Sequence, residues 1–132
     1  MRFLIDTHAF LWYMAGNRKI TAKAIDLIDD STNNDRLLSA AALWEIAIKY
    51  SKGRLELKEP FESLIPRLIQ QNSLSILDIT IKHTAAVATL PYPASGHKDP
   101  FDRLMIAQCQ VEQIPIVSCD DKFDAYNIQR WW

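Results

Sequence analysis

The chain has 132 residues, 48% of them hydrophobic and 23% charged, which is typical of one globular domain with one core, here predicted over residues 1–132. Its formal net charge of −1 argues against a protein that holds nucleic acid mainly through counterion release, but not against an enzyme that acts on nucleic acid. No apolar run has the roughly 18 residues of a membrane span and no signal peptide precedes Asp6, so we expect a cytoplasmic protein outside the membrane.

Short apolar runs alternate with helical patterns in the first half of the chain. The predicted elements are a strand over 2–5, helices over 8–14 and 21–30, a second apolar run over 36–39 and a helix over 40–50. Thr21 can cap its helix, and Gly53 is expected to end the helix over 40–50. In that last helix we predict one shared face for Leu43, Ile46, Ala47 and Tyr50.

The second half continues the same alternation. After a loop over 54–59 we predict an amphipathic helix over 61–71, disturbed by Pro66, then a strand over 74–79, a helix over 80–90 and a turn-rich stretch over 91–96. A helix over 100–112, a buried strand over 114–118 and an edge strand over 127–132 follow. Strands separated by helices predict an α/β fold with a mainly parallel sheet between two helical layers.

Two predicted strands are each followed by an acidic residue. Asp6 comes directly after the first strand, and Asp120 comes after the buried strand near the C-terminus. In parallel sheets the functional crevice lies beyond the carboxyl ends of the strands, so both residues are candidates for one shared site. Each also suits the N-cap of a helix, and at either position alone the pattern does not separate capping from chemistry.

Glu45 lies inside the predicted helix over 40–50, with apolar residues on either side of it. A buried carboxylate needs a charged partner, a metal ion or a shifted pKa, because its desolvation is costly. We therefore interpret Glu45 as a candidate site residue. The alternative, also compatible with the helical period, is a side chain that faces solvent.

The segment HKDPFDR carries two acids at the start of a predicted helix. Asp99 suits the N-cap, Pro100 the first helical position and Asp102 the first turn, so helix-start chemistry alone explains all three. Residues three apart share one helix face, however, so Asp99 and Asp102 can also point to a common centre. Asp120 and Asp121 present the same choice between cap and ligand.

Carboxylates gathered in one place would need a cation. Two of them about 4 Å apart repel by roughly 4 kcal/mol at an effective dielectric constant of about 20, and further acids multiply this cost. Oxygen ligands with few His or Cys candidates favour Mg²⁺ or Mn²⁺ over Zn²⁺. We therefore predict a divalent-cation site that acts on phosphates.

Other conspicuous residues receive structural interpretations. The histidines lack zinc-ligand spacing, and His8 and His97, which flank the proposed acids, are kept only as substrate contacts. Tryptophans such as Trp44 could stack on nucleic-acid bases, but aromatic residues among aliphatic ones are more often core. The basic stretch that begins at Lys49 is interpreted as a solvated helix end, and the two cysteines as reduced thiols.

Four ordered motifs carry a family resemblance: LIDTHAFLW, SAAALWEIAIKYSKGRL, HKDPFDRLMIAQC and IPIVSCDDKF. In this order they are similar to the PIN-domain ribonucleases, and specifically to the VapC-like toxins of type II toxin–antitoxin pairs. The resemblance covers nearly the whole chain. It implies a single PIN-like domain with a three-layer α/β/α fold.

The resemblance also implies roles for individual residues. The acids that match the family's metal-binding and catalytic positions are Asp6, Glu45, Asp102 and Asp120. Asp99 is an additional catalytic candidate, either as a direct ligand or as a support for Asp102. Thr7 and Ser118 match hydroxyl positions beside the acids, with Ser118 where Thr is frequent. Together with His97 they are weaker candidates, either for contact with substrate or for support of the acids.

The activity implied is Mg²⁺- or Mn²⁺-dependent endonucleolytic cleavage of RNA, with water activated near Asp6 and Asp102, and with Glu45 orienting either that water or a second ion. The resemblance further implies a homodimer and a small antitoxin partner that covers the acidic site, in contact with apolar positions around Trp12 and 61–69. A catalytically inert PIN-like interaction module is the alternative. A phosphatase of the haloacid type is disfavoured, because it would need an Asp where His8 stands.

Overall fold

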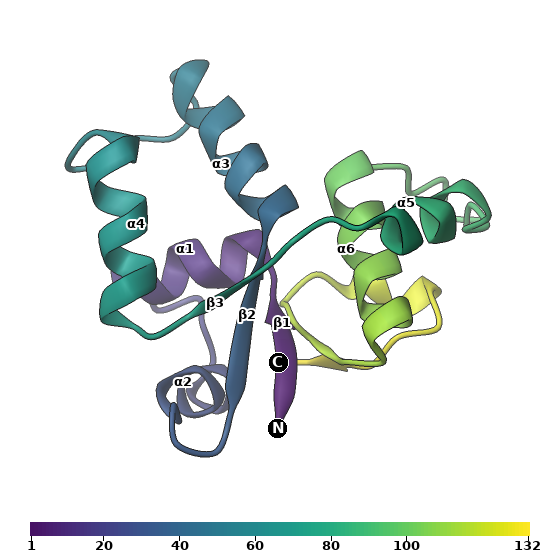
Figure 1. Ribbon diagram of the computed structural model, residues 1–132, viewed down its shortest axis with the longest axis horizontal. Helices are drawn as coiled ribbons and strands as arrows, with labels where there is room; N and C mark the ends of the chain where they lie inside the picture. The colour runs from purple at the N-terminus through teal and green to yellow at the C-terminus, as the bar shows by residue number, and fades with distance from the viewer.

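Five parallel strands form the centre of the protein. The computed structural model describes residues 1–132, and its sheet has the strand order β3-β2-β1-β4-β5 (Figure 1). The strands are β1 (Arg2–Ile5), β2 (Asp35–Ser39), β3 (Ser75–Leu77), β4 (Ile116–Val117) and β5 (Arg130–Trp131). Every neighbouring pair is parallel, which confirms the predicted sheet.

Helices cover both faces of this sheet. They are α1 (Thr7–Ala15), α2 (Ala22–Asp29), α3 (Ala40–Ser51), α4 (Phe61–Gln71), α5 (Ile81–Ala88) and α6 (Pro100–Glu112), followed by a short 3₁₀ helix, η1 (Asp121–Ala125). In Figure 1, α1, α2 and α4 lie to one side of β1 and β2, and α5 and α6 lie to the other. The three-layer α/β/α arrangement is therefore confirmed. No helix is both long and apolar enough to cross a membrane.

The central strands are short and apolar because both of their faces are covered. Phe3, Leu4 and Ile5 of β1 are fully buried, as are Ile116 and Val117 of β4. Such continuous apolar runs are characteristic of strands in the middle of a parallel sheet. Asp6 and Ser118 thus follow two adjacent buried strands, β1 and β4, at the same edge of the sheet.

The buried face of α3 is not the face that Leu43, Ile46, Ala47 and Tyr50 share. The residues that pack into the core are Ala41, Ala42 and Ile46, whereas Leu43 is only partly buried and Tyr50 is exposed. Small alanines thus make up much of the buried face, while larger apolar side chains of this helix stay partly exposed. Because Glu45 lies on the alanine face, it is turned inward.

Some predicted boundaries also differ. Pro66 does not disturb α4, which runs unbroken over Phe61–Gln71, since the proline removes a single backbone donor and its ring faces solvent. The strands predicted over 74–79, 114–118 and 127–132 are shorter, at Ser75–Leu77, Ile116–Val117 and Arg130–Trp131. Apolar side chains continue beyond the residues that pair, because packing extends further than the hydrogen-bonded ladder. Cys109 and Cys119 are free thiols.

Arg36 ties three elements together without a carboxylate partner. Its guanidinium is buried and donates to the carbonyl oxygens of Ile28 (2.5 Å), Asn72 (2.7 Å) and Ser73 (3.2 Å). Arg36→Met would leave these carbonyls without their donor, so we expect the free energy of unfolding to fall by about 3 kcal/mol. Urea denaturation measures this loss, and Arg18→Met, at an exposed position, should change stability by less than about 0.5 kcal/mol.

Candidate active site

Asp6 is both a helix cap and a buried acid. Its Oδ1 accepts the backbone N–H of Thr7 (2.8 Å) at the start of α1, and its Oδ2 accepts the hydroxyl of Ser118 (2.8 Å), just beyond β4. The side chain is held between the ends of the two central strands, and the residue is only 3% exposed. The N-cap interpretation of Asp6 is therefore confirmed, and the same carboxylate lies at the strand end where the site was predicted.

The electrostatic environment of Asp6 opposes its charge. Burial raises the pKa of Asp6 to about 6, and the negative charge of Glu45 contributes in the same direction. The hydrogen bonds from Ser118 and Thr7, together with the nearby His8, act in the opposite direction without cancelling this effect. A positive ion placed beside Asp6 would relieve this unfavourable environment.

Glu45 is buried, as predicted, on the inward face of α3. It is 7% exposed, and its Oε2 lies 3.0 Å from the ammonium of Lys49, one helical turn later. Its other oxygen, Oε1, is buried and has no hydrogen-bond partner. Lys49 is therefore not simply part of a solvated helix end, because its charge compensates a buried acid.

Removal of the Lys49 charge should destabilise the fold, because Glu45 is buried and Lys49 is its charged partner. We expect Lys49→Met to lower the free energy of unfolding by about 1–2 kcal/mol at neutral pH, because one carboxylate then stays buried without a partner. Adding Glu45→Gln to this variant should restore stability. Urea denaturation tests both, with the exposed Lys52→Met as control; a loss of equal size in the control would contradict the role given to Lys49.

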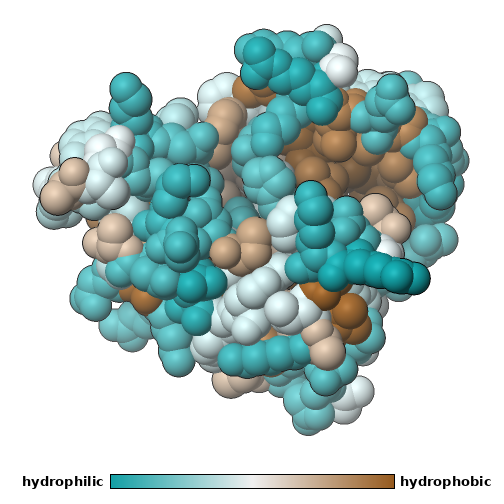
Figure 2. Space-filling view, turned by 180° about the vertical axis from the view of Figure 1, so that it is seen from behind, coloured by the Kyte–Doolittle hydropathy of each residue, from teal (hydrophilic) through white to brown (hydrophobic).

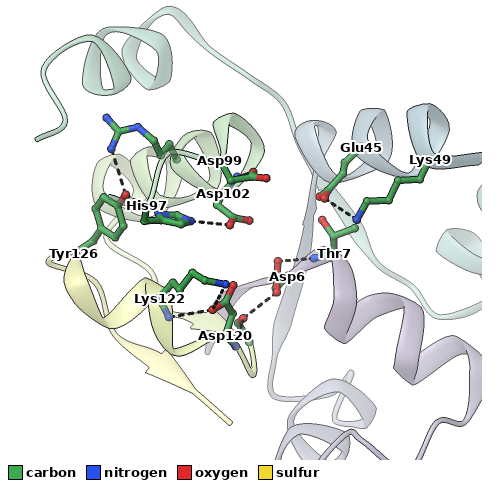
Figure 3. Close-up of polar contacts among 12 residues, drawn as sticks. Asp6, Thr7, Glu45, Lys49, His97, Asp99, Asp102, Asp120, Lys122 and Tyr126 are labelled. Atoms are coloured by element: carbon green, nitrogen blue, oxygen red, sulfur yellow. Dashed lines mark hydrogen bonds and ion pairs between the residues drawn. The ribbon is translucent and has the colours of Figure 1, made fainter. Parts of the chain in front are cut away.

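Asp99 and Asp102 share the start of α6 but have different roles. Asp99 is the N-cap, and its Oδ1 accepts the backbone N–H of Asp102 (2.9 Å). Burial raises the pKa of Asp102 to about 6, and the charges of Asp99 and Asp6 contribute in the same direction. These two acids, 96 positions apart in the chain, are close enough for the charge of Asp6 to act on Asp102, and Figure 3 shows their side chains near each other.

Asp120 joins this group through Ser118. Its backbone N–H donates to Ser118 Oγ (3.0 Å), the same hydroxyl that donates to Asp6, and its Oδ1 accepts the backbone N–H of Lys122 (3.0 Å) at the start of η1. Figure 3 shows the side chains of Asp6, Asp102 and Asp120 around one space, with Glu45 on its opposite side. The predicted acids are therefore brought to one edge of the sheet.

His97, Arg103 and Tyr126 form a polar cluster behind Asp102. The Nε2 of His97 lies 2.9 Å from Asp102 Oδ2, and its Nδ1 lies 2.8 Å from the hydroxyl of Tyr126. His97 was predicted as a weak candidate for contact with substrate or for support of the acids; its side chain is 5% exposed and lies against Asp102. Arg103 and Tyr126 were not predicted at all; Arg103 belongs to the HKDPFDR motif, whereas no sequence signal marks Tyr126.

Comparison with known families identifies the class of this domain. A family model described as PIN domain matches residues 3–128, almost the whole chain. The chain belongs to the PIN domain family. The matched range includes all five acids of the PIN domain described above, together with His97 and Tyr126.

Individual relatives support the same fold. Ribonuclease VapC16 from Mycobacterium tuberculosis is 41% identical to this PIN domain over 58 residues, which are 44% of this chain and 41% of that protein. The match thus spans less than half the length of that relative.

Two solved structures resemble the whole chain. VapBC2 from Rickettsia felis, bound to a promoter DNA fragment, has a TM-score of 0.70 at 18% identity and covers 100% of both chains. VapBC-1 from nontypeable Haemophilus influenzae has a TM-score of 0.71 at 16% identity, covering 99% of this chain and 97% of that one. At such low identities the likeness shows a shared PIN fold alone.

The acids of this PIN domain do not form a closed ligand set. No three His, Cys, Asp or Glu side chains are gathered so that they could hold a metal ion. Each acid instead has a protein partner, and the pairs include Glu45 with Lys49 and Asp102 with His97. This pairing differs from the predicted convergence of the acids on one ion. Carboxylates repel one another, so each is more stable beside a hydrogen-bond donor or a positive charge of the protein.

The residues nevertheless fit a divalent cation. Two buried oxygens beside Asp6, Thr7 Oγ1 and Glu45 Oε1, have no hydrogen-bond partner, and the charge of Glu45 acts on Asp6. Burial raises the pKa of both Asp6 and Asp102, as expected for carboxylates that lack a compensating charge. An all-oxygen donor set of this kind suits Mg²⁺ or Mn²⁺.

Proposed function

We propose that this PIN domain is a Mg²⁺- or Mn²⁺-dependent endoribonuclease. The observation that carries the proposal is the pair formed by Asp6 and Asp102, which are desolvated and face the same space, with the charge of Asp6 raising the pKa of Asp102. Perturbed acids grouped in this way are typical of functional sites. Asp6, Asp102 and Glu45 would hold the cation, and Asp120 would complete the set, while Asp99 supports Asp102 through the helix cap.

The chemistry divides between the cation and the protein. A bound Mg²⁺ or Mn²⁺ would supply an activated water and stabilise negative charge on the phosphate. Ser118 and Thr7 hold Asp6 at the end of β1, so that its carboxylate is fixed before any ligand arrives. Glu45, with its unpaired Oε1, can accept a hydrogen bond from the attacking water and orient it.

The proposal is tested directly with purified protein and a mixture of cellular RNAs. We expect internal cleavage in Mg²⁺ or Mn²⁺ and none after chelation with EDTA, and mapping of the new RNA ends then identifies the preferred sequence. Cleavage that survives EDTA would contradict the proposal. If the protein neither cleaves RNA nor binds Mn²⁺ by calorimetry, the alternative of an inert interaction module holds.

Trp44 offers a contact for the RNA bases. It is 61% exposed on α3, next to Glu45, and its ring meets Phe101 of α6 edge to face at a centroid distance of 5.3 Å. The two rings therefore connect α3 and α6, the helices that carry Glu45 and Asp102. Because base stacking on an aromatic side chain contributes about 1–3 kcal/mol, Trp44→Ala should raise the KM for RNA roughly 10-fold or more with little change in kcat.

Steady-state cleavage of a short RNA measures this effect, and Trp44→Phe should retain most of the affinity. Ile81→Ala, which shortens another exposed apolar side chain, serves as control. An unchanged KM in Trp44→Ala would show that Trp44 does not contact RNA. Its exposed ring would then be a contact for a protein partner.

We also propose that the protein is the toxin of a toxin–antitoxin pair and acts in the cytoplasm as a homodimer. The structural relatives named above are VapBC assemblies, one of them bound to promoter DNA.

Figure 2 shows an apolar hollow on the rear face, and a groove of about 670 Å³ lies between α1, α4 and the segment 54–59. The groove is lined by Trp12, Leu64 and Leu68. It is also lined by His8, whose charge acts on Asp6, and by Lys49, which pairs with Glu45. An antitoxin segment in this groove would reach the site and block RNA.

A further inference from the structure

A chain of hydrogen bonds, buried at its Arg103 end and partly buried at its other end, leads from Arg103 to the carboxylate of Asp102. Arg103 Nη1 donates to the hydroxyl oxygen of Tyr126 (3.2 Å), Tyr126 lies 2.8 Å from Nδ1 of His97, and Nε2 of His97 lies 2.9 Å from Asp102 Oδ2. Figure 3 shows His97 between Tyr126 and Asp102. The chain joins three separate parts of the sequence: the loop before α6, the first turn of α6 and the residue after η1.

The donors in this chain determine the direction of its hydrogen bonds. Arg103 is always a donor, so the oxygen of Tyr126 accepts from it and its own hydroxyl hydrogen remains to be donated. The acceptor within reach is Nδ1 of His97. An imidazole that accepts at Nδ1 carries its hydrogen on Nε2, and this N–H then donates to Asp102 Oδ2.

Arg103, the first residue of this hydrogen-bond chain, is held in place by further contacts. Its guanidinium also donates to the carbonyl oxygens of Leu90 (2.6 Å) and Pro91 (3.2 Å), and it lies 3.8 Å from the centre of the Tyr92 ring. The partners of the Arg103 guanidinium are thus carbonyl oxygens, a hydroxyl group and an aromatic ring. The contacts of Arg103 anchor the start of the loop that carries His97, and its bond to Tyr126 holds the hydroxyl that lies against Nδ1 of His97.

We propose that His97 is a positioning residue for Asp102, with its Nε2–H tautomer fixed by Tyr126 and Arg103, so that one carboxylate oxygen is held and the other is left for the cation. The inference rests on the proposed function, since it assigns a role in cation binding. The hydrogen bonds to the Asp102 carboxylate go to Oδ2 alone, and its backbone N–H is taken by Asp99, so Oδ1 stays available. Partners of this kind commonly change metal affinity about 10- to 100-fold.

The first test is made on the metal-free protein. Imidazole ¹H–¹⁵N correlation spectra report which ring nitrogen carries hydrogen, and we expect His97 to show the Nε2–H tautomer at neutral pH. In Tyr126→Phe, which lacks only the hydroxyl, this preference should weaken to a mixture of the two tautomers. An Nδ1–H tautomer or a doubly protonated ring in the wild-type protein would overturn the assignment.

The second test compares two replacements of His97 that differ in reach. The amide nitrogen of Gln can occupy the place of Nε2 and donate to Asp102, whereas that of Asn stops near Nδ1 and cannot. Calorimetric titration with Mn²⁺ should give about 10-fold or greater weakening for His97→Asn and less than about 3-fold for His97→Gln. Circular dichroism and thermal unfolding check that both variants are folded.

Equal Mn²⁺ affinity in His97→Asn and wild type, or an equal loss in both variants, would overturn the proposal, because packing alone would then account for His97. If the wild type itself binds no Mn²⁺, the cation-dependent function fails, while the tautomer in the metal-free protein still decides the hydrogen-bond chain.

Discussion

Asp6→Asn and Asp102→Asn are each expected to lower the rate of RNA cleavage by about 1,000-fold or more, equal to roughly 4 kcal/mol of transition-state stabilisation. Each change removes one negative charge from the shared site and keeps the shape of the side chain. The fold should survive Asp6→Asn, because the amide oxygen of the new side chain can accept the N–H of Thr7 while its NH₂ donates to Ser118 Oγ.

Single-turnover cleavage at saturating Mn²⁺ measures the loss, with circular dichroism as the check on folding. The matched control is Asp26→Asn, an acid exposed on α2 and remote from the site, which should cleave at the wild-type rate. Wild-type rates in both site variants would refute the nuclease proposal. A comparable loss in Asp26→Asn would instead point to a general effect of charge.

The second large effect concerns stability: without metal, Asp6→Asn should raise the free energy of unfolding by roughly 3 kcal/mol at pH 7.5. The pKa of Asp6 is about 6 in the folded protein, compared with 3.8 for an ordinary aspartate. The folded state therefore prefers the protonated acid. As the pH rises from about 4 to above 6, the carboxyl must ionise in an unfavourable environment, and the contribution of Asp6 to stability falls.

The predicted pH dependence of the stability difference is tested by chemical denaturation of the wild type and Asp6→Asn at pH 4.5 and 7.5. The advantage of Asp6→Asn should be small at the lower pH and grow as the pH increases, and Mn²⁺ at pH 7.5 should stabilise the wild type more than the variant. Acids such as Asp124, whose pKa is lowered by Arg130, give the opposite slope, so the difference between the two proteins isolates Asp6. An Asp6→Asn protein less stable than wild type at pH 7.5 would contradict the raised pKa.

Much of the fold could be predicted because its signals are local. The bounds of α4 and α6 agree with the sequence prediction, since amphipathic spacing defines α4 and the Asp99-Pro100 pair marks the start of α6. The position of Asp6 and Asp120 after strands also follows from the order of apolar runs. In a parallel sheet this order already places both acids at one edge.

The sequence by itself thus determined the order of the elements, the parallel sheet and the identity of the acids, because periodicity, caps and turns depend on neighbouring residues. The tertiary structure decided which face of α3 is buried, that Lys49 neutralises Glu45, and that His97 stands between Asp102 and Tyr126. It also decided the raised pKa of Asp6 and Asp102. Burial and contacts between distant segments depend on how the layers pack in space, and no local pattern along the chain encodes them.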